Sequence, residues 1–286
     1  MARIAKDYYL TEVDKLPGSI YCMHDFMGED GIQPHQHVKD QLLYTEGGLV
    51  HVKVQDTTYF LPARHYMWIP AGLKHSIHPG SNAVTMRNLY FPKKQGDEVF
   101  SSQAGIFPVN ELLLQMLLFT HQWDGDILPE REAEFGFVSA LRLILPQLSQ
   151  NQLLLMLPIP TDKRLTQIIQ YMDEFMQEGV LLPQLAQQFG FSERSLSRLF
   201  KSNIRMSFVQ YHTIQRMLKA LKLLLDNKME IKEVAALVGY NSIPTFSATF
   251  RKVLGTSPSA YAKRNDSFNL KDQLTEFDNI LSSNDK

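Results

Sequence analysis

The sequence predicts two domains of different class: an all-β barrel or sandwich followed by helices, and then an all-α carboxyl-terminal domain. The first prediction comes from strands with a period of two, because Val50, Val52 and Val54 alternate with polar residues between turn signals in residues 18–91. The second comes from helical spacing of apolar residues throughout residues 163–264. A chain of 286 residues is long enough for two cores of ordinary domain size.

Two helices are predicted between these domains, from two groups of apolar residues at helical spacing: Leu112, Leu113, Met116 and Leu117, then Phe137, Leu141, Ile144, Leu145 and Leu148. The apolar faces could pack on the β domain, on each other or on a second copy of the chain. The two prolines in residues 157–162 then predict a semi-rigid connector that ends in the N-cap Asp162. We therefore expect a β domain in 1–107, a helical hairpin with its connector in 108–160, a helical domain in 161–264 and a polar tail in 265–286.

The charge is divided unevenly along the chain. Residues 162–264 hold 15 Lys and Arg against 8 Asp and Glu, whereas the remainder holds 14 against 22. A basic domain in an otherwise acidic chain indicates that this part meets a polyanion. The start of the chain lacks a signal-peptide core, no run is long enough for a membrane span, and Cys22 is the single cysteine, so we expect a cytoplasmic protein without membrane contact.

The helical region contains an internal repeat. Gly190 and Phe191 recur 49 residues later as Gly239 and Tyr240, and further apolar and basic residues recur at a spacing of 50. Each copy has a short apolar helix, a turn with glycine and a second helix with a serine cap, which is a helix-turn-helix pattern. Between the copies, residues 208–225 predict an amphipathic spacer helix about 27 Å long, compared with roughly 34 Å for one turn of DNA.

In the first copy, Ser192 caps the predicted recognition helix. Its outer face carries five polar residues: Arg194, Ser195, Ser197, Arg198 and Lys201. Arg194 and Arg198 are the candidates for reading bases, because arginine can donate two parallel hydrogen bonds to guanine. An ordinary solvated basic face is the alternative.

In the second copy, Ser242 caps a helix that tolerates Pro244 in its first turn. The outer face offers short side chains, among them Thr245 and Ser247, which cannot bridge a guanine. We therefore expect apolar and hydroxyl contacts here, together with phosphate binding by Arg251 and Lys252.

These residues resemble the AraC family of regulators over about 100 positions. The resemblance is carried by Leu185-Ala186, Gly190 to Phe200, Val234-Ala235, Gly239-Tyr240, Phe246, Phe250-Arg251, Gly255 to Pro258 and Tyr261. The amino-terminal half resembles the cupin-type sensor domain of many members, through His35-Gln36-His37, Gln41 to Tyr44, Trp68 to Gly72 and His75. The resemblance implies a ligand pocket in the barrel, a homodimer, and control of promoters by a small effector.

One position departs from the family pattern. Arg205 stands in the turn where the family usually has glycine and where the second copy has Gly255. An arginine in a left-handed conformation costs on the order of 1 kcal/mol, so either the turn differs locally or the strain is tolerated. A phosphate contact by Arg205 is a further option.

The histidines at positions 35, 37 and 75 occupy places that converge on one metal in the metal-dependent cupins that this half resembles. Gln41 stands where those proteins have a carboxylate, so we favour a ligand pocket in which the histidines and Gln41 are hydrogen-bonding groups. Tyr44 and Trp68, with Tyr66, are candidate apolar walls, or plain core. A divalent metal at His35, His37 and His75 is the alternative, and no cofactor is otherwise expected.

We therefore expect a DNA-binding transcription regulator rather than an enzyme, with promoter DNA and a small effector as partners and RNA polymerase as a further candidate. A metal-sensing regulator is the second hypothesis. A metal-dependent cupin enzyme with an accessory helical domain is the third, and the duplicated basic helix-turn-helix argues against it.

Overall fold

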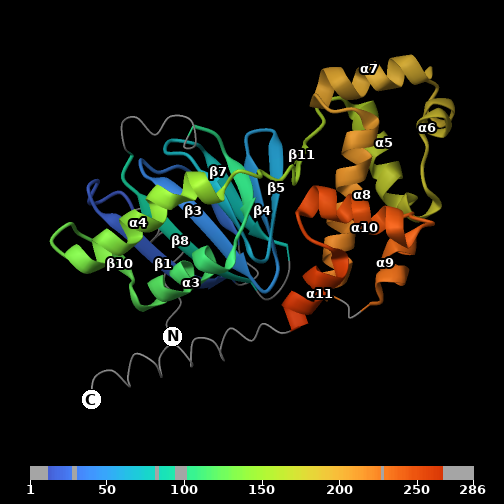
Figure 1. The fold of residues 1–286 in the computed structure, drawn as a ribbon. Coiled ribbons are helices and arrows are strands. Elements are labelled where there is room, and N and C mark those ends of the chain that lie inside the picture. Colours follow the sequence, from blue (N-terminus) through green and yellow to red (C-terminus); the bar gives the residue numbers. More distant parts are fainter. Residues whose placement is uncertain (1–11, 28–30, 81–83, 94–101, 227–228, 267–286) are drawn as a thin grey trace. The chain divides into compact units, whose positions relative to one another are not determined.

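The computed structural model describes residues 12–27, 31–80, 84–93, 102–226 and 229–266 (Figure 1). The described residues form two compact units, one of residues 12–52, 61–153 and 264–266 and the other of residues 53–60 and 154–263. No helix within the described residues is long and apolar enough to cross a membrane. The predicted tail after residue 266 lies outside the described residues.

The amino-terminal β region forms two sheets, as the period-two pattern predicted. The first sheet is antiparallel and has the order β10 (Gly125–Ile127), β1 (Ile20–Met27), β8 (Val84–Phe91), β3 (Asp40–Glu46), β6 (His65–Ile69) and β9 (Gly105–Pro108). The second sheet has the order β11 (Met156–Pro158), β5 (Thr57–Pro62), β4 (Leu49–Val54), β7 (His75–Pro79) and β2 (Ile32–His35). Val50, Val52 and Val54 are buried in β4, whereas His51 and Lys53 are not.

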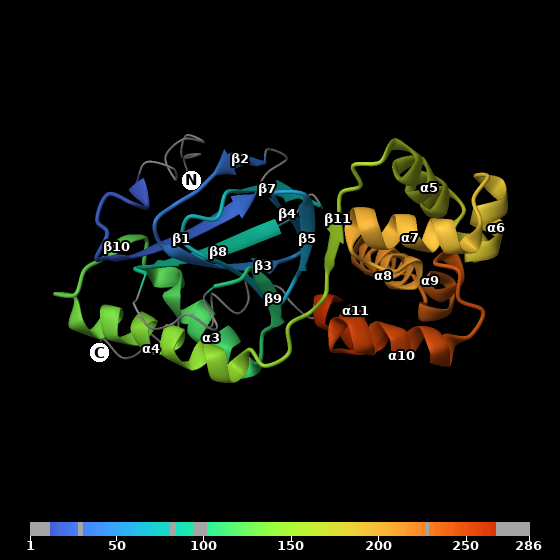
Figure 2. The same ribbon diagram turned by 90° about the horizontal axis from the view of Figure 1, so that it is seen from above.

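The two predicted helices are α3 (Glu111–Phe119) and α4 (Glu132–Leu148), with the short 3-10 turn η1 (Thr120–Gln122) after α3. Both cover one face of the first sheet (Figures 1 and 2) and share its apolar core. They also contact each other, since the rings of Phe119 and Phe137 lie 4.9 Å apart. Leu112 is 56% exposed, whereas Leu113 and Leu114 of the same helix face the core.

The proline-containing connector begins as a strand. Residues of β11 pair with β5, with Met156 opposite Tyr59 and Pro158 opposite Thr57. Proline is tolerated here because β11 is at the edge of its sheet. The predicted N-cap is confirmed, since the Asp162 carboxylate accepts hydrogen bonds from the backbone N–H groups of Arg164 and Leu165.

The second unit is helical, as predicted. Its helices are α5 (Lys163–Glu174), the 3-10 turn η2 (Met176–Glu178), α6 (Leu182–Gln188), α7 (Glu193–Ile204), α8 (Phe208–Asp226), α9 (Ile231–Leu237), α10 (Ile243–Leu254) and α11 (Pro258–Asp266). Helices α6 and α7 form the first helix-turn-helix, α9 and α10 form the second, and α8 joins them (Figure 1). The predicted caps Ser192 and Ser242 accept hydrogen bonds from the N–H groups of Ser195 and Thr245.

The two turn glycines have equivalent conformations and different surroundings. Gly190 and Gly239 both have positive φ angles, of 68° and 76°. A Cβ on Gly190 would meet nothing within 4 Å, whereas a Cβ on Gly239 would lie 2.4 Å from the carbonyl oxygen of Met176. The second turn therefore packs directly against η2.

Arg216 of α8 adds a second contact to this turn. Its guanidinium lies 3.6 Å from the ring centroid of Tyr240, and its Nε donates a hydrogen bond to the carbonyl of Val238. Arg216 is therefore partly buried and holds this turn against α8.

These surroundings predict unequal effects of the same substitution. Gly190→Ala should lower the free energy of unfolding by about 1 kcal/mol, which is the conformational cost alone. Gly239→Ala should lower it by about 2 to 4 kcal/mol, because the close contact with Met176 adds to that cost. Denaturant unfolding of both variants measures the difference, and equal losses would contradict the close packing at Gly239.

Candidate functional site

Strand pairing brings the three predicted histidines together. His35 ends β2 and lies opposite His75, the first residue of β7, in the register of the second sheet (Figure 2). His37 follows in the loop before β3. The ring centroids of His35 and His75 are 4.3 Å apart, and His37 lies 5.2 Å from His75 and 6.0 Å from His35. One candidate ligand atom from each ring lies within 4.8 Å of the other two.

Each of these rings is held by its own backbone. The Nδ1 atoms of His35, His37 and His75 lie 2.9, 2.5 and 2.8 Å from the carbonyl oxygens of residues 33, 39 and 73. A carbonyl oxygen only accepts, so each Nδ1 carries a proton and donates it. In the neutral ring this leaves Nε2 with its lone pair.

Burial favours the neutral form of two of the rings. His75 is 1% exposed, and burial, with smaller contributions from His35 and His37, lowers its pKa to about 3. Burial and the neighbouring His37 also lower the pKa of His35. Both rings are therefore neutral at pH 7 and present lone pairs rather than charges.

Gln41 is buried and its amide lies beside this cluster. Its Nε2 donates to Asn88 Oδ1 at 2.7 Å and to the Tyr90 hydroxyl at 3.2 Å, and its Oε1 faces His37 Nε2 at 3.1 Å. The sequence analysis missed Asn88 and Tyr90. The register of β3 with β8, which pairs Gln41 with Tyr90, puts them on the same face of the sheet, and that register cannot be read from either strand alone.

Tyr44 and Trp68, with Tyr66, do not share this space, which corrects the prediction that they line the pocket. They belong to the core beneath α3 and α4, together with Leu42. Side chains alternate between the two faces of a strand, so Leu42 and Tyr44 lie opposite Gln41. Because alternate residues of β3 point to opposite faces of the sheet, the aromatic residues lie on the other face from the histidines. Their position agrees with the alternative prediction, in which they are core residues.

A buried ion pair fixes the segment that carries His37. Asp40 Oδ2 accepts a hydrogen bond from Arg142 of α4 at 2.8 Å, and its Oδ1 accepts one from the N–H of Ala71 at 2.9 Å. The side chains of Asp40 and Arg142 are 3% and 6% exposed. The backbone N–H of Gly72 also donates to the carbonyl of His37. The loop is thus bound both to a turn and to a helix.

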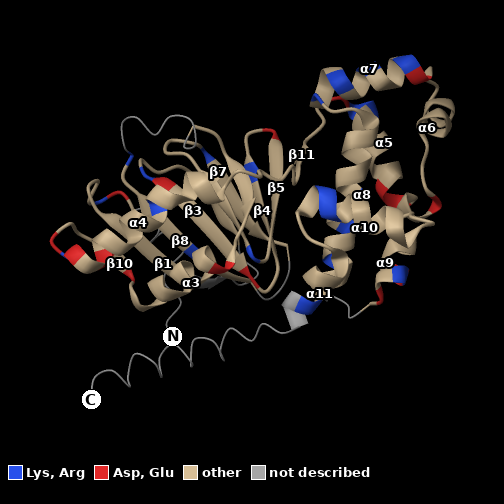
Figure 3. Cartoon of the chain, in the orientation of Figure 1, with Lys and Arg blue, Asp and Glu red and all other residues tan. Residues whose placement is uncertain are grey.

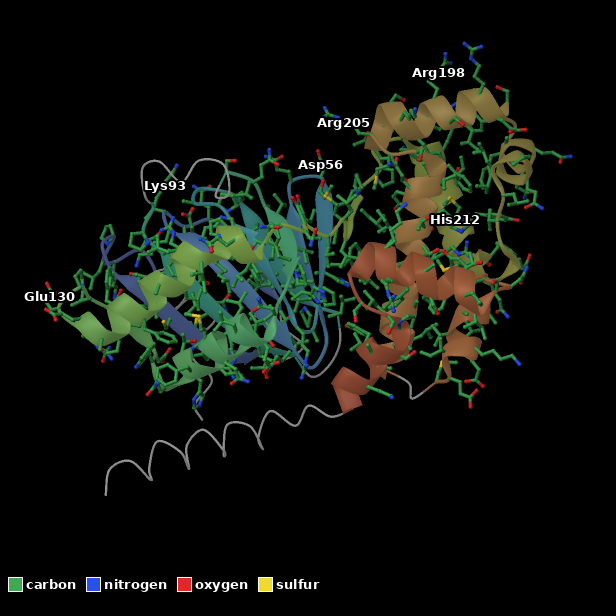
Figure 4. The ribbon with its side chains drawn as sticks, in the orientation of Figure 1. Asp56, Lys93, Glu130, Arg198, Arg205 and His212 are labelled. Atoms are coloured by element: carbon green, nitrogen blue, oxygen red, sulfur yellow. The ribbon has the colours of Figure 1, made fainter. Side chains whose placement is uncertain are left out.

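In the second unit, the outer face of α7 is basic and open. Arg194, Arg198 and Lys201 are exposed, whereas Leu196 and Phe200 on the opposite face are buried. Figure 3 shows the basic residues along this helix, and Figure 4 shows Arg198 pointing away from the unit. Ser195 and Ser197 are partly buried, and the Ser195 hydroxyl donates to the Ser192 carbonyl within the cap.

Helix α10 exposes a different set. Thr245, Arg251 and Lys252 are exposed and Ser247 is partly buried. The Thr245 hydroxyl donates to Ser242 Oγ at 3.0 Å, so part of its hydrogen-bonding capacity is used by the cap. A shallow hollow is lined by Ser247, Ala248, Arg251 and Lys252. The charge of this helix therefore lies in its last turn.

Two family models match the chain, one in each unit. The AraC-like ligand binding domain matches residues 18–125, and a helix-turn-helix domain matches residues 185–264. Together they cover about two thirds of the sequence, in the order that such regulators have. The chain belongs to the AraC family. It is an AraC-type DNA-binding regulator with an amino-terminal ligand-binding domain.

Several individual proteins are similar to this chain. The HTH-type transcriptional regulator NimR of Escherichia coli K12 is 28% identical over 245 residues, which are 85% of this chain and 87% of NimR. The HTH-type transcriptional activator RhaR of Pectobacterium atrosepticum is 41% identical over 78 residues, which are 27% of this chain and 28% of RhaR. Among solved structures, the C-terminal domain of AraT from Geobacillus stearothermophilus is 32% identical with a TM-score of 0.35, and the match covers 36% of this chain and 86% of that domain.

Arg205 stands where the AraC family usually has glycine, and the structure shows its backbone conformation. Arg205 ends α7 with φ 56° and ψ 17°, in the left-handed region, and Gly255 does so in the second copy. The turn therefore does not differ locally; the strain is tolerated. Figure 4 shows the Arg205 side chain extending away from its helix.

The buried Asp40–Arg142 pair predicts a large loss of stability when one partner is replaced and a recovery when both are replaced. Arg142→Met should lower the free energy of unfolding by about 3 to 5 kcal/mol, because it leaves a buried carboxylate without its partner. The double variant Asp40→Asn, Arg142→Met should recover most of that loss. Denaturant unfolding measures both variants.

The matched control is Arg131→Met, at the N-cap of α4. Arg131 pairs with Glu134 at 3.0 Å in an exposed position, so its replacement should change stability little. A small loss in Arg142→Met, similar to this control, would contradict the importance of the buried pair.

Proposed function

We propose that this AraC-family chain is a sequence-specific regulator whose DNA affinity is set by a small effector bound at the histidine cluster. The observation that carries the proposal is the exposed basic face of α7, on a helix whose other face is the core of the matched helix-turn-helix domain. The regulator would act without catalysis, and the enzyme hypothesis finds no support in that basic face.

Within the DNA-binding domain, we propose different roles for the two recognition helices. Arg194 and Arg198 read bases, since their exposed guanidinium groups can donate two parallel hydrogen bonds to a guanine. Ser195, Ser197 and Lys201 add hydroxyl and phosphate contacts. Thr245 and Ser247 contact base edges only through short side chains, and Arg251 and Lys252 bind phosphates. Specificity therefore comes mainly from α7.

In the sensor domain, we propose that His35, His37, His75 and Gln41 contact the effector. Their polar atoms come together from three strands and a loop, and the cluster lies within the matched ligand-binding domain. We leave Tyr44 and Trp68 out of the proposed contacts, because they lie in the core beneath α3 and α4.

We also propose the division of labour that the sequence predicts, with a sensor in 1–107, helices and connector in 108–160, DNA binding in 161–264 and a tail in 265–286. Promoter DNA in the cytoplasm is the partner that the family assignment favours, with RNA polymerase as a further contact. A homodimer is supported by Leu112 of α3 and Leu143 of α4, which are 56% and 61% exposed on adjacent helices.

The base-reading role predicts a selective loss of affinity. Arg198→Ala should weaken binding to the chain's own operator about 5- to 150-fold, which corresponds to roughly 1 to 3 kcal/mol, while binding to scrambled DNA changes little. Lys252→Ala should weaken binding to both DNAs and reduce the salt dependence by about one phosphate contact. Titration of the upstream intergenic DNA by gel shift at several salt concentrations measures these quantities.

The control is Lys74→Ala, which removes an exposed lysine of the sensor domain and should leave both affinities unchanged. Equal losses on operator and scrambled DNA for Arg198→Ala would reject its base-reading role. A wild-type protein that shows no preference between the two DNAs would reject the proposed function itself.

The dimer proposal predicts a change in mass. The pair of substitutions Leu112→Glu and Leu143→Glu should shift the full chain from dimer toward monomer in sedimentation equilibrium, because charges would oppose burial of that surface. Val209→Glu is the matched control, since Val209 is 67% exposed on α8. A wild-type chain that stays monomeric at high concentration would contradict the dimer.

A further inference from the structure

We propose that His35, His37 and His75, together with Gln41, bind one divalent transition-metal ion of the zinc, cobalt and nickel class. The ion would be the effector, or the part of the site to which an effector binds. This inference rests on the proposed function only in that it assigns a ligand class to the same sensor site; metal binding itself does not require that the chain bind DNA.

The first observation is that the three imidazoles lie close together. The three imidazoles are brought together from the end of β2, the following loop and the start of β7, and their ligand atoms lie within 4.8 Å of one another. Zinc-bound imidazole nitrogens lie about 2.0 to 2.1 Å from the ion, so side-chain movements on the order of 1 Å would complete the coordination. The strand pairing of His35 with His75 supplies most of that arrangement before any ion arrives.

The direction of the ring nitrogens is the second observation. All three Nδ1 atoms donate to backbone carbonyls, which is the partner that metal-binding histidines commonly use to fix ring orientation. When a ring so held is neutral, its lone pair is on Nε2 and is available to a metal ion.

Unsatisfied acceptors are the third observation. His75 is 1% exposed, and its Nε2 is buried without a hydrogen-bond partner. Gln41 Oε1 faces His37 Nε2 at 3.1 Å, so two acceptors face each other when that ring is neutral and its proton is on Nδ1. A cation beside these atoms satisfies all of them at once.

The donor set selects the kind of ion. Three imidazoles and one amide oxygen suit zinc, cobalt, nickel or iron(II), whereas magnesium and calcium prefer sets of carboxylate oxygens. The carboxylate nearest in sequence, Asp40, is occupied by Arg142 and by the N–H of Ala71. A set without a carboxylate also binds less tightly than one with it, which suits an ion or ligand that must come and go.

The test uses the full chain without a histidine tag, treated with a chelator and titrated with Co²⁺. We expect about one Co²⁺ per chain, with a visible absorption band from nitrogen ligation and displacement by Zn²⁺. His75→Gln and His37→Gln should each lower the Co²⁺ affinity on the order of 100-fold. His78→Gln, on the same strand β7, is the control and should leave the affinity unchanged, because His78 instead contacts the Ser76 hydroxyl.

The variant Gln41→Glu distinguishes a metal site from an arrangement in which Gln41 donates a hydrogen bond to His37 and no metal binds. If both amides were turned over, the Gln41 N–H would donate to His37 without any metal, with Asn88 turned to match. A carboxylate cannot donate, so this variant should raise Co²⁺ affinity by tenfold or more if an ion is bound, and it should fail to do so otherwise. The variant keeps the test informative even if the glutamine substitutions of histidine unfold the domain.

The outcomes distinguish this inference from the proposed function. Wild-type protein that binds Co²⁺ no better than His75→Gln would overturn the metal site, and specific DNA binding in the same preparation would leave the regulator standing. Stoichiometric Co²⁺ binding that depends on His37, His75 and Gln41 would support the site. If that protein had no operator preference, the metal site would stand and the proposed function would fail.

Discussion

The buried ion pair between Asp40 and Arg142 is the interaction on which the amino-terminal unit depends most. It joins α4 to the start of β3, and the same carboxylate holds the turn at Ala71. Two charges removed from water stabilise the fold only when each is fully paired, so the geometry of this corner is tightly specified. The loop with His37 comes directly before Asp40, so the position of the loop depends on this ion pair.

The Asp40–Arg142 pair also lies between the proposed ligand site of the sensor domain and the helix α4. A ligand at His35, His37 and His75 would contact the loop and β7, and Arg142 lies on the helix that covers the sheet. Arg142 stacks over Trp68 and Phe91 as well, with distances of 5.8 and 5.6 Å to the ring centroids. The Asp40–Arg142 pair is therefore the contact that connects the loop carrying His37 with α4.

Much of the fold could be predicted from the sequence because its signals are local. Period-two alternation at Val50 to Val54, the caps Asp162, Ser192 and Ser242, and the repeated turn glycines each depend on a few neighbouring residues. The predictions that were wrong concern features that depend on tertiary contacts. The face of the sheet that Tyr44 and Trp68 occupy follows from strand parity relative to the helices.

The site was predictable in part for the same reason. His35 and His37 are close in sequence, and His75 joined them through the family resemblance, but the orientation of the rings depends on carbonyl groups that only the folded backbone provides. Asn88 and Tyr90 enter through the register of β3 with β8, which no single segment encodes. Whether Leu112 or Leu114 faces the core could not be decided from spacing either, since leucine occupies three consecutive positions.

The short strand β11 has a consequence for how the sensor domain can be studied alone. It pairs with β5 and so covers an edge of the second sheet, with Ile159 adding a backbone hydrogen bond to Asp56. A fragment that stops before residue 156 would present the unpaired N–H and C=O groups of β5 to other molecules, and such edges recruit further strands. Self-association of that fragment would then reflect an exposed sheet edge rather than the assembly of the intact regulator.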